Sequence, residues 1–241
     1  MQLKIYKDYQ SLSSHMVDEM IALIKHKPNA VIVCASGDSP RLTCKLFTER
    51  VTADKVDVSQ ITFIGLDEWI GILPENEGSC RYFFDSLIVK PLRLNSSQCH
   101  FFNALSNNPA SECVKMDKLI AEKGGIDLMI VGIGMNGHIG FNEPGVSFDN
   151  YSHIIQLDET TTTVGQKYFN GTTKLEKGIT IGLRHLIESK KVILMANGTK
   201  KASVIQKAVE GGFSNQFPAS IMQKHANGFV AIDEEAASLV S

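Results

Sequence analysis

Short apolar runs, separated by polar stretches rich in turn-forming residues, recur along the whole chain. These runs predict strands, and they lie at residues 30–35, 60–66, 128–131, 153–157, 179–183, 191–196 and 229–232. The run at 128–131 is apolar at every position, as expected of a strand that is buried on both faces of a sheet. The pattern therefore indicates a sheet with buried central strands.

The segments between these runs carry helical spacing or helix-boundary signals. They predict helices over residues 9–27, 41–51, 79–89 and 110–123, and a further helix that follows the 191–196 strand and ends at about 209. Ser39 is the expected N-cap of the second helix, with Pro40 at its first position. Residues 160–171 are polar and turn-rich, which predicts an irregular connection, and we expect a lid at about 158–178.

Strands that alternate with helices predict an α/β fold. We expect a single domain over residues 1–241, with three layers, a Rossmann-like and mainly parallel sheet, and helices on both faces. In such a sheet, ligands bind beyond the carboxyl ends of the strands. Functional residues are therefore sought where the predicted strands end.

Composition narrows the class of protein. The net charge is −2 with no basic block, which argues against binding to nucleic acid or an anionic membrane. No uncharged apolar run reaches the roughly 18 residues that cross a bilayer, and charges near the N-terminus argue against a signal peptide. Five cysteines without a C-x-x-C pair argue against a disulfide framework. We expect a cytoplasmic protein, and the sequence leaves open whether it forms a homo-oligomer.

The most unusual stretch of the chain follows the 128–131 strand. There the sequence becomes rich in glycine, and it interleaves Asn136, His138 and Glu143. Glycine lets a backbone approach a ligand closely, and an imidazole beside a carboxylate is suited to acid–base chemistry. This loop is the first candidate for a catalytic site.

The same loop contains a G-x-G-x-x-G pattern that resembles a dinucleotide-binding fingerprint. Gly132, Gly134 and Gly137 form the pattern. The fingerprint also needs a helix that opens at its last glycine, and Gly140 and Pro144 leave no room for one. We therefore expect no nicotinamide or flavin cofactor, and nothing in the sequence predicts a metal site.

Three other strand ends carry unusual polar groups. Asp67 and Glu68 follow the 60–66 strand beside Trp69, the only tryptophan. The other two ends precede predicted helices, whose N-termini attract anions through free N–H groups and the helix dipole. Those two ends are formed by Ser36, Gly37, Asp38 and Ser39 and by Thr199, Lys200 and Lys201. Two anion sites together with a histidine and carboxylates predict a small phosphorylated substrate that undergoes proton transfer.

These residues resemble one enzyme family. The segments AVIVCASGDSP, VDVSQITFIGLDEW, GIGMNGHIGFNEPG and NGTKKA are similar to those of glucosamine-6-phosphate deaminases/isomerases, and more closely to the galactosamine-6-phosphate branch. The resemblance covers nearly the whole chain. It implies a cofactor-free aldose–ketose isomerisation, with loss of ammonia from C2 of a 2-amino-2-deoxy-hexose 6-phosphate.

The resemblance also assigns roles to individual positions. Asp67 matches the general base that moves a proton between C2 and C1, and His138 matches the residue that opens the sugar ring, with Glu143 as its partner. Lys167 falls where glucosamine deaminases carry an arginine. The positions expected to contact the substrate or its phosphate are Ser36, Gly37, Asp38, Ser39, Gly137, Lys167 and Lys201.

One position departs from the glucosamine enzymes. They carry an aspartate where this chain has Asn136, whereas the galactosamine branch carries asparagine. We therefore expect galactosamine 6-phosphate as substrate, with tagatose 6-phosphate and ammonia as products. The alternatives are a glucosamine-6-phosphate deaminase that yields fructose 6-phosphate, a 6-phosphogluconolactonase that needs no C2 base, and a non-enzymatic effector-binding domain for sugar phosphates. The last would follow a DNA-binding helix-turn-helix, for which a sheet that begins at about residue 30 leaves little room.

Overall fold

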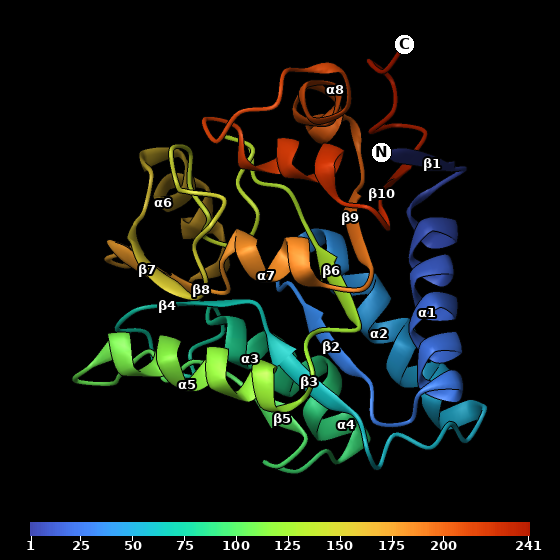
Figure 1. Ribbon diagram of the computed structural model, residues 1–241, viewed down its shortest axis with the longest axis vertical. Coiled ribbons are helices and arrows are strands. Elements are labelled where there is room, and N and C mark those ends of the chain that lie inside the picture. The colour runs from blue at the N-terminus through green and yellow to red at the C-terminus, as the bar shows by residue number, and fades with distance from the viewer.

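The computed structural model describes residues 1–241, and its centre is a seven-stranded parallel sheet (Figure 1). Its strand order is β1-β10-β9-β6-β2-β3-β5. The strands are β1 (Gln2–Tyr6), β2 (Val31–Cys34), β3 (Thr62–Gly65), β5 (Cys99–His100), β6 (Leu128–Val131), β9 (Val192–Ala196) and β10 (Gly228–Asp233).

Helices cover both faces of this sheet, as predicted. Along β2, Val31 and Val33 point to one face and Ile32 and Cys34 to the other, because side chains alternate along a strand. The first face packs against α5 (Pro109–Glu122), α7 (Leu183–Glu188), α8 (Ala202–Glu210) and η4 (Pro218–Lys224). The second packs against α1 (Tyr9–His26), α2 (Asp38–Ala53), α3 (Cys80–Phe84) and the π-helix η1 (Asp85–Val89), which α4 (Lys90–Leu92) follows. The three-layer α/β prediction is confirmed.

The order of the strands creates a switch point between β2 and β6. From β2 the chain adds β3 and β5 on one side, and it then returns to add β6, β9 and β10 on the other. Connections on the two sides leave the sheet in opposite directions, so a crevice opens beyond the carboxyl ends of the two strands. This geometry brings the turn after β2 beside the glycine-rich loop after β6.

A second, smaller sheet was not predicted. It is antiparallel, in the order β4-β8-β7, and consists of β4 (Asp67–Trp69), β8 (Lys177–Thr180) and β7 (His153–Gln156). Only Leu66 separates β3 from β4, so the chain passes directly from one sheet into the other. Asp67 is therefore the first residue of a new strand. Backbone pairing with β8 fixes the direction in which its side chain points.

Two predicted boundaries are wrong. Helix α2 begins at Asp38 with Gly37 as its N-cap, so Ser39 lies inside the first turn and makes no capping hydrogen bond. Gly37 has a φ of 114°, which glycine tolerates and which allows the helix to start earlier. The sheet begins at Gln2 instead of near residue 30, because β1 is an edge strand whose mixed burial gives no continuous apolar run.

The expected irregular connection at 160–171 is also wrong. Residues Glu159–Gly165 form α6, and Gln166–Tyr168 form the 3₁₀ turn η2. The Asp158 side chain caps α6 by accepting the Thr160 N–H at 2.8 Å. A run of β-branched threonines has low helix propensity, so the packing of α6 against the small sheet outweighs the local preference.

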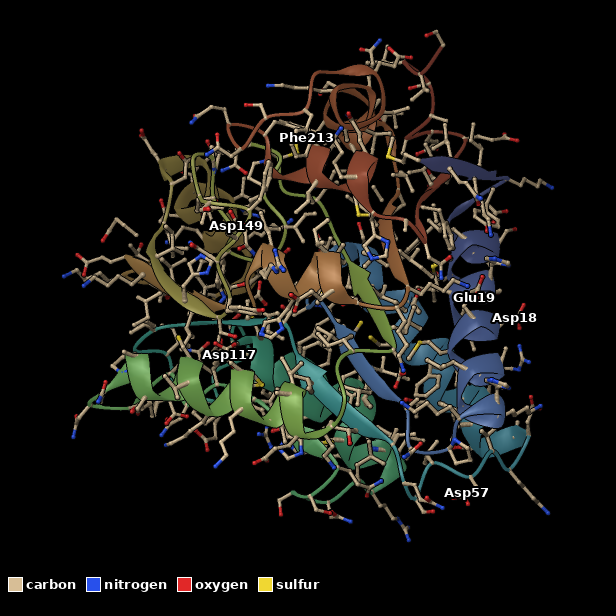
Figure 2. The ribbon with its side chains drawn as sticks, viewed as in Figure 1. Asp18, Glu19, Asp57, Asp117, Asp149 and Phe213 are labelled. Atoms are coloured by element: carbon tan, nitrogen blue, oxygen red, sulfur yellow. The ribbon has the colours of Figure 1, made fainter.

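A polar contact ties the small sheet to the helices beneath it. Figure 2 shows Asp117 on the side of α5 that faces α7. The His185 ring Nε2 of α7 lies 2.8 Å from its Oδ1 atom, and the Ser152 N–H donates to the same atom at 3.1 Å.

None of the helices combines the length and apolar character needed to cross a membrane.

Candidate active site

A pocket lies beyond β2 and β6, at the switch point of the large sheet. It is walled by the turn after β2, the glycine-rich loop, β4, α6 and η2. The residues predicted from sequence that line it are Ser36, Gly37, Asp38, Ser39, Asp67, Asn136, His138, Lys167 and Lys201. Glu143 lies buried behind His138. Gly137 is not among the lining residues and packs against Phe217, so its expected contact with substrate stays a prediction.

The imidazole of His138 is positioned by hydrogen bonds on the side of its Nδ1 atom. Its Nδ1 lies 3.1 Å from Glu143 Oε2, and the Asn136 side-chain amide donates to the same oxygen at 2.8 Å. Burial raises the pKa of Glu143, but hydrogen bonds and the charge of His138 more than offset this and lower it overall. A carboxylate accepts the Nδ1 proton, which leaves Nε2 with a lone pair for a ligand.

The glycines of this loop are explained by its tight packing. A Cβ atom on Gly134 would lie 2.2 Å from the His138 ring. Gly137 and Gly140 have φ values of 85° and 57°, so the chain turns back on itself, and no helix begins at Gly137. The glycines of the G-x-G-x-x-G pattern therefore allow the loop to pack closely against an imidazole, and they do not precede a helix N-terminus.

The carboxyl group of Asp67 faces the same pocket and is poorly satisfied. Its Oδ1 atom is buried without a hydrogen-bond partner. Burial and the adjacent charge of Glu68 raise the pKa of Asp67 to about 7, against a smaller opposing effect of the Cys80 thiol. A carboxyl group that titrates near neutral pH is suited to accept and return a proton.

The neighbouring acid, Glu68, has a structural role. It is buried on the opposite side of β4 and accepts backbone N–H groups from Trp69 at 2.9 Å, Cys80 at 3.0 Å and Arg81 at 2.7 Å. It thereby caps the first turn of α3 and holds that helix against the strand. Of the two acids predicted together at this strand end, only Asp67 lines the pocket.

Cations gather at the other end of the pocket. Lys201 Nζ reaches in and donates to the Ile133 carbonyl at 2.5 Å. Burial, with a further contribution from the charge of Lys167, lowers the pKa of Lys201 to about 8. Lys167 Nζ pairs with Asp38 Oδ2 at 2.5 Å, and both side chains are largely exposed. Together with the first N–H groups of α2, these ammonium groups can hold an anion.

The second predicted anion site is only partly correct. The Gly198 N–H is taken by the carboxylate of Asp233, at 3.0 and 3.1 Å to its two oxygens. Thr199 and Lys200 do not line the pocket. The 3₁₀ turn η3 (Thr199–Lys201) therefore contributes one ammonium group and no backbone cradle.

Helix α6 closes one side of the pocket. Its Gly165 packs so tightly on Trp69 that a Cβ atom would lie 2.7 Å from the indole ring. The lining residues that were not singled out from sequence include Thr161, Tyr168 and Cys80. The capping signal at Asp158, followed by Glu159, could have revealed α6 and with it Thr161. Cys80 carries no comparable sequence signal.

The chain is similar to proteins of one family over nearly its full length. Residues 7–231 match the family model described as glucosamine-6-phosphate isomerases/6-phosphogluconolactonase. A glucosamine-6-phosphate deaminase of Clostridium botulinum (strain Alaska E43 / Type E3) is 34% identical over 242 residues, covering 100% of this chain and 97% of the relative. One from Thermoanaerobacter pseudethanolicus is 33% identical over 241 residues, covering 100% and 95%.

Solved structures show the same similarity. A structure described as a monomeric glucosamine-6-phosphate deaminase matches with a TM-score of 0.95 at 31% identity, covering 99% of this chain and 100% of that chain. The 6-phosphogluconolactonase of Trypanosoma brucei matches with a TM-score of 0.79 at 14% identity, covering 100% and 98%. The second match shows a shared fold alone.

Proposed function

The chain belongs to the family of glucosamine-6-phosphate isomerases and 6-phosphogluconolactonases, and from that membership we propose that it converts glucosamine 6-phosphate and water into fructose 6-phosphate and ammonia. It is an enzyme of the isomerase/deaminase kind that acts on an amino-sugar 6-phosphate. The observation that carries the proposal is the buried, unpartnered carboxyl oxygen of Asp67 in the same pocket as the His138–Glu143 pair.

Substrate binding uses the cationic end of the pocket. The 6-phosphate sits against the N-terminus of α2, where Ser36, Gly37 and Ser39 line the wall, and against Lys201. Each charge-assisted hydrogen bond of this kind contributes about 1.5–3 kcal/mol. This binding energy fixes the sugar carbons between Asp67 and His138.

Ring opening falls to His138. The lone pair of Nε2 takes the proton of the anomeric hydroxyl, and the resulting imidazolium returns a proton to the ring oxygen as the C1–O bond breaks. The carboxylate of Glu143, 3.1 Å from Nδ1, stabilises that charge. The product of this step is the open-chain aldehyde.

Asp67 then carries out the isomerisation. Its carboxylate removes the proton from C2, the electron pair forms a C1–C2 double bond, and the aldehyde oxygen becomes an enol hydroxyl with a proton that the substrate's ammonium group gives up through solvent. Asp67 returns the proton to C1, which leaves a protonated imine at C2. Water adds to the imine and ammonia leaves, so that the ketose is formed. A pKa near 7 lets one carboxyl group serve as base and then as acid at neutral pH.

The choice of epimer is the finer part of the proposal. The sequence-based expectation was galactosamine 6-phosphate, which rested on Asn136. The named relatives are glucosamine-6-phosphate deaminases, so they support the gluco alternative better. Asn136 donates to Glu143, so its role is the support of the carboxylate, and it needs no contact with the C4 hydroxyl.

The test compares ammonia release from the two amino-sugar 6-phosphates with no added cofactor. We expect a higher kcat/KM for the gluco epimer. The Asp67→Asn variant should lose at least about a thousandfold in kcat while still binding substrate, because the amide cannot accept the C2 proton. A preference for the galacto epimer would reverse the substrate assignment, and unchanged turnover in the variant would contradict the mechanism. A hydrolysed 6-phosphogluconolactone with no ammonia from either sugar would favour the lactonase alternative.

A further inference from the structure

Helix α6 places a buried hydroxyl group against the proposed catalytic histidine. Thr161 is 5% exposed, and its Oγ1 lies 3.0 Å from His138 Nδ1. We propose that Thr161 is a positioning residue for His138, which together with Glu143 fixes the ring so that Nε2 faces the substrate. This inference rests on the proposed function in that it takes His138 as the group that opens the sugar ring.

The hydroxyl group of Thr161 is shared by three polar partners. The Asn136 side-chain amide donates to the Thr161 hydroxyl at 3.4 Å. His138 Nδ1 is within hydrogen-bond distance of both this hydroxyl and the Glu143 carboxylate, at 3.0 and 3.1 Å. A hydroxyl has two lone pairs and one proton, so it can accept from both nitrogens and donate to Glu143. With Glu143 as its only partner, Nδ1 would hold its proton less firmly and the ring would rotate more freely, whereas the second partner, Thr161, favours one tautomer and restricts rotation of the ring.

The surroundings distinguish this role from packing. Thr161 is one of four consecutive threonines, Thr160 to Thr163. Thr162 donates to the Glu159 carbonyl within the helix, and Thr163 is exposed. Valine has nearly the shape of threonine, so packing of α6 would accept it at position 161. Only the contact with the imidazole network requires a hydroxyl there.

The kinetic test uses three single variants. Thr161→Val should lower kcat roughly 10- to 30-fold with KM changed less than about twofold, because the hydrogen bond orients a reacting group and does not touch the phosphate. Thr161→Ser restores the hydroxyl and should recover kcat to within about threefold of wild type. Thr163→Val makes the same chemical change on the exposed side of the same helix and should leave both constants unaltered. A Thr161→Val enzyme with wild-type kcat, or one that serine does not rescue, would overturn the proposal.

A second readout does not depend on turnover. Long-range ¹H–¹⁵N spectra of the free protein, with the His138 signals assigned by their loss in His138→Gln, report which ring nitrogen carries the proton. The wild type and Thr163→Val should show a single Nδ1–H tautomer, and Thr161→Val a mixture or broadened ring signals. An unchanged tautomer in Thr161→Val would contradict the positioning role even if the amino sugars proved not to be substrates. A changed tautomer with no ammonia release from the wild type would instead point to failure of the proposed function.

Discussion

Two strand–turn–helix junctions of this protein have similar sequences and different uses. After β2, the chain turns at Gly37 into α2, and the N-terminus of that helix lines the pocket. After β9, the chain turns at Gly198 into η3 and α8, but the Gly198 N–H is already bound by Asp233. Both turns contain a glycine with positive φ, at 114° and 81°. The first junction offers backbone donors to a ligand, and the second offers only the Lys201 side chain.

The difference arises from residues that are distant in the sequence. Asp233 ends β10, 35 positions after Gly198, and it also accepts the Ala236 N–H at 2.8 Å. An internal carboxylate thus takes the place that a phosphate would occupy at a helix N-terminus. The presence of a turn and a helix start is therefore insufficient evidence for an anion site, because the rest of the fold decides whether the donors remain available.

Among changes at the two junctions, the largest expected effect comes from the cation of the second junction. Lys201→Met keeps an unbranched apolar stem but removes the ammonium group. We expect kcat/KM for the amino-sugar phosphate to fall roughly 10- to 100-fold, chiefly through KM, since one charge-assisted hydrogen bond to the phosphate is lost. Steady-state kinetics measures this. Lys200→Met, at a neighbouring position outside the pocket, is the matched control, and an equal loss there would contradict the assignment.

The same contrast predicts a pH dependence, because an ammonium group titrates and backbone N–H groups do not. The pKa of Lys201 is lowered to about 8, so the free enzyme loses this charge as the pH rises through that value. The pKa of Asp67 is raised to about 7, so the base forms only as the pH rises through that value. kcat/KM should therefore peak between about 7 and 8. Lys201→Met should lose the alkaline limb attributed to Lys201, and retention of that limb would assign it to another group.

A third change asks whether Asp233 is a structural substitute for an anion. Asp233→Ala removes the hydrogen-bond acceptor of the partly buried Gly198 N–H and of the buried Ala236 N–H. We expect the free energy of unfolding to fall by about 1–3 kcal/mol, with KM altered less than about twofold. Urea unfolding measures the loss. Added sulfate should raise the Tm of the variant more than that of the wild type, and a rise in KM matching that of Lys201→Met would contradict the distinction between the junctions.

The smallest expected effect concerns an acid at the first junction. Asp38 pairs with Lys167, so it competes with the substrate phosphate for that ammonium group. Because the pair is exposed, its contribution is below about 1 kcal/mol, and Asp38→Asn should lower KM by about two- to fivefold with kcat unchanged. Glu77 lines the same pocket but accepts a hydrogen bond from Asn170 and forms no ion pair with Lys167, so Glu77→Gln serves as the control. An increase in KM for Asp38→Asn would show that Asp38 assists phosphate binding.

The parts of the fold that are visible in the sequence are those that local rules govern. Apolar runs located β2, β6 and β9, since a strand buried on both faces admits few polar residues. The glycine-rich loop revealed His138 and Glu143, because the two residues lie close together in one loop of the sequence. The edge strand β1 has neither signal, and it is defined by its pairing with β10.

The parts that were missed depend on tertiary contacts. Asp67 belongs to a strand only because β8, more than a hundred residues later, pairs with it. Thr161 meets His138 only because α6 folds over the small sheet, against the low helix propensity of its threonines. No local pattern contains that information, so the site could be outlined from sequence while its supporting contacts could not.

The packing of Trp69 on Gly165 has a practical consequence. Trp69 is the only tryptophan in the chain, and its indole ring contacts α6 directly. Indole emission responds to the polarity of its surroundings, so any displacement of α6 that admits water would change the intrinsic fluorescence of the protein. Stopped-flow mixing with substrate could therefore time the movement of this helix against ammonia release without an introduced label.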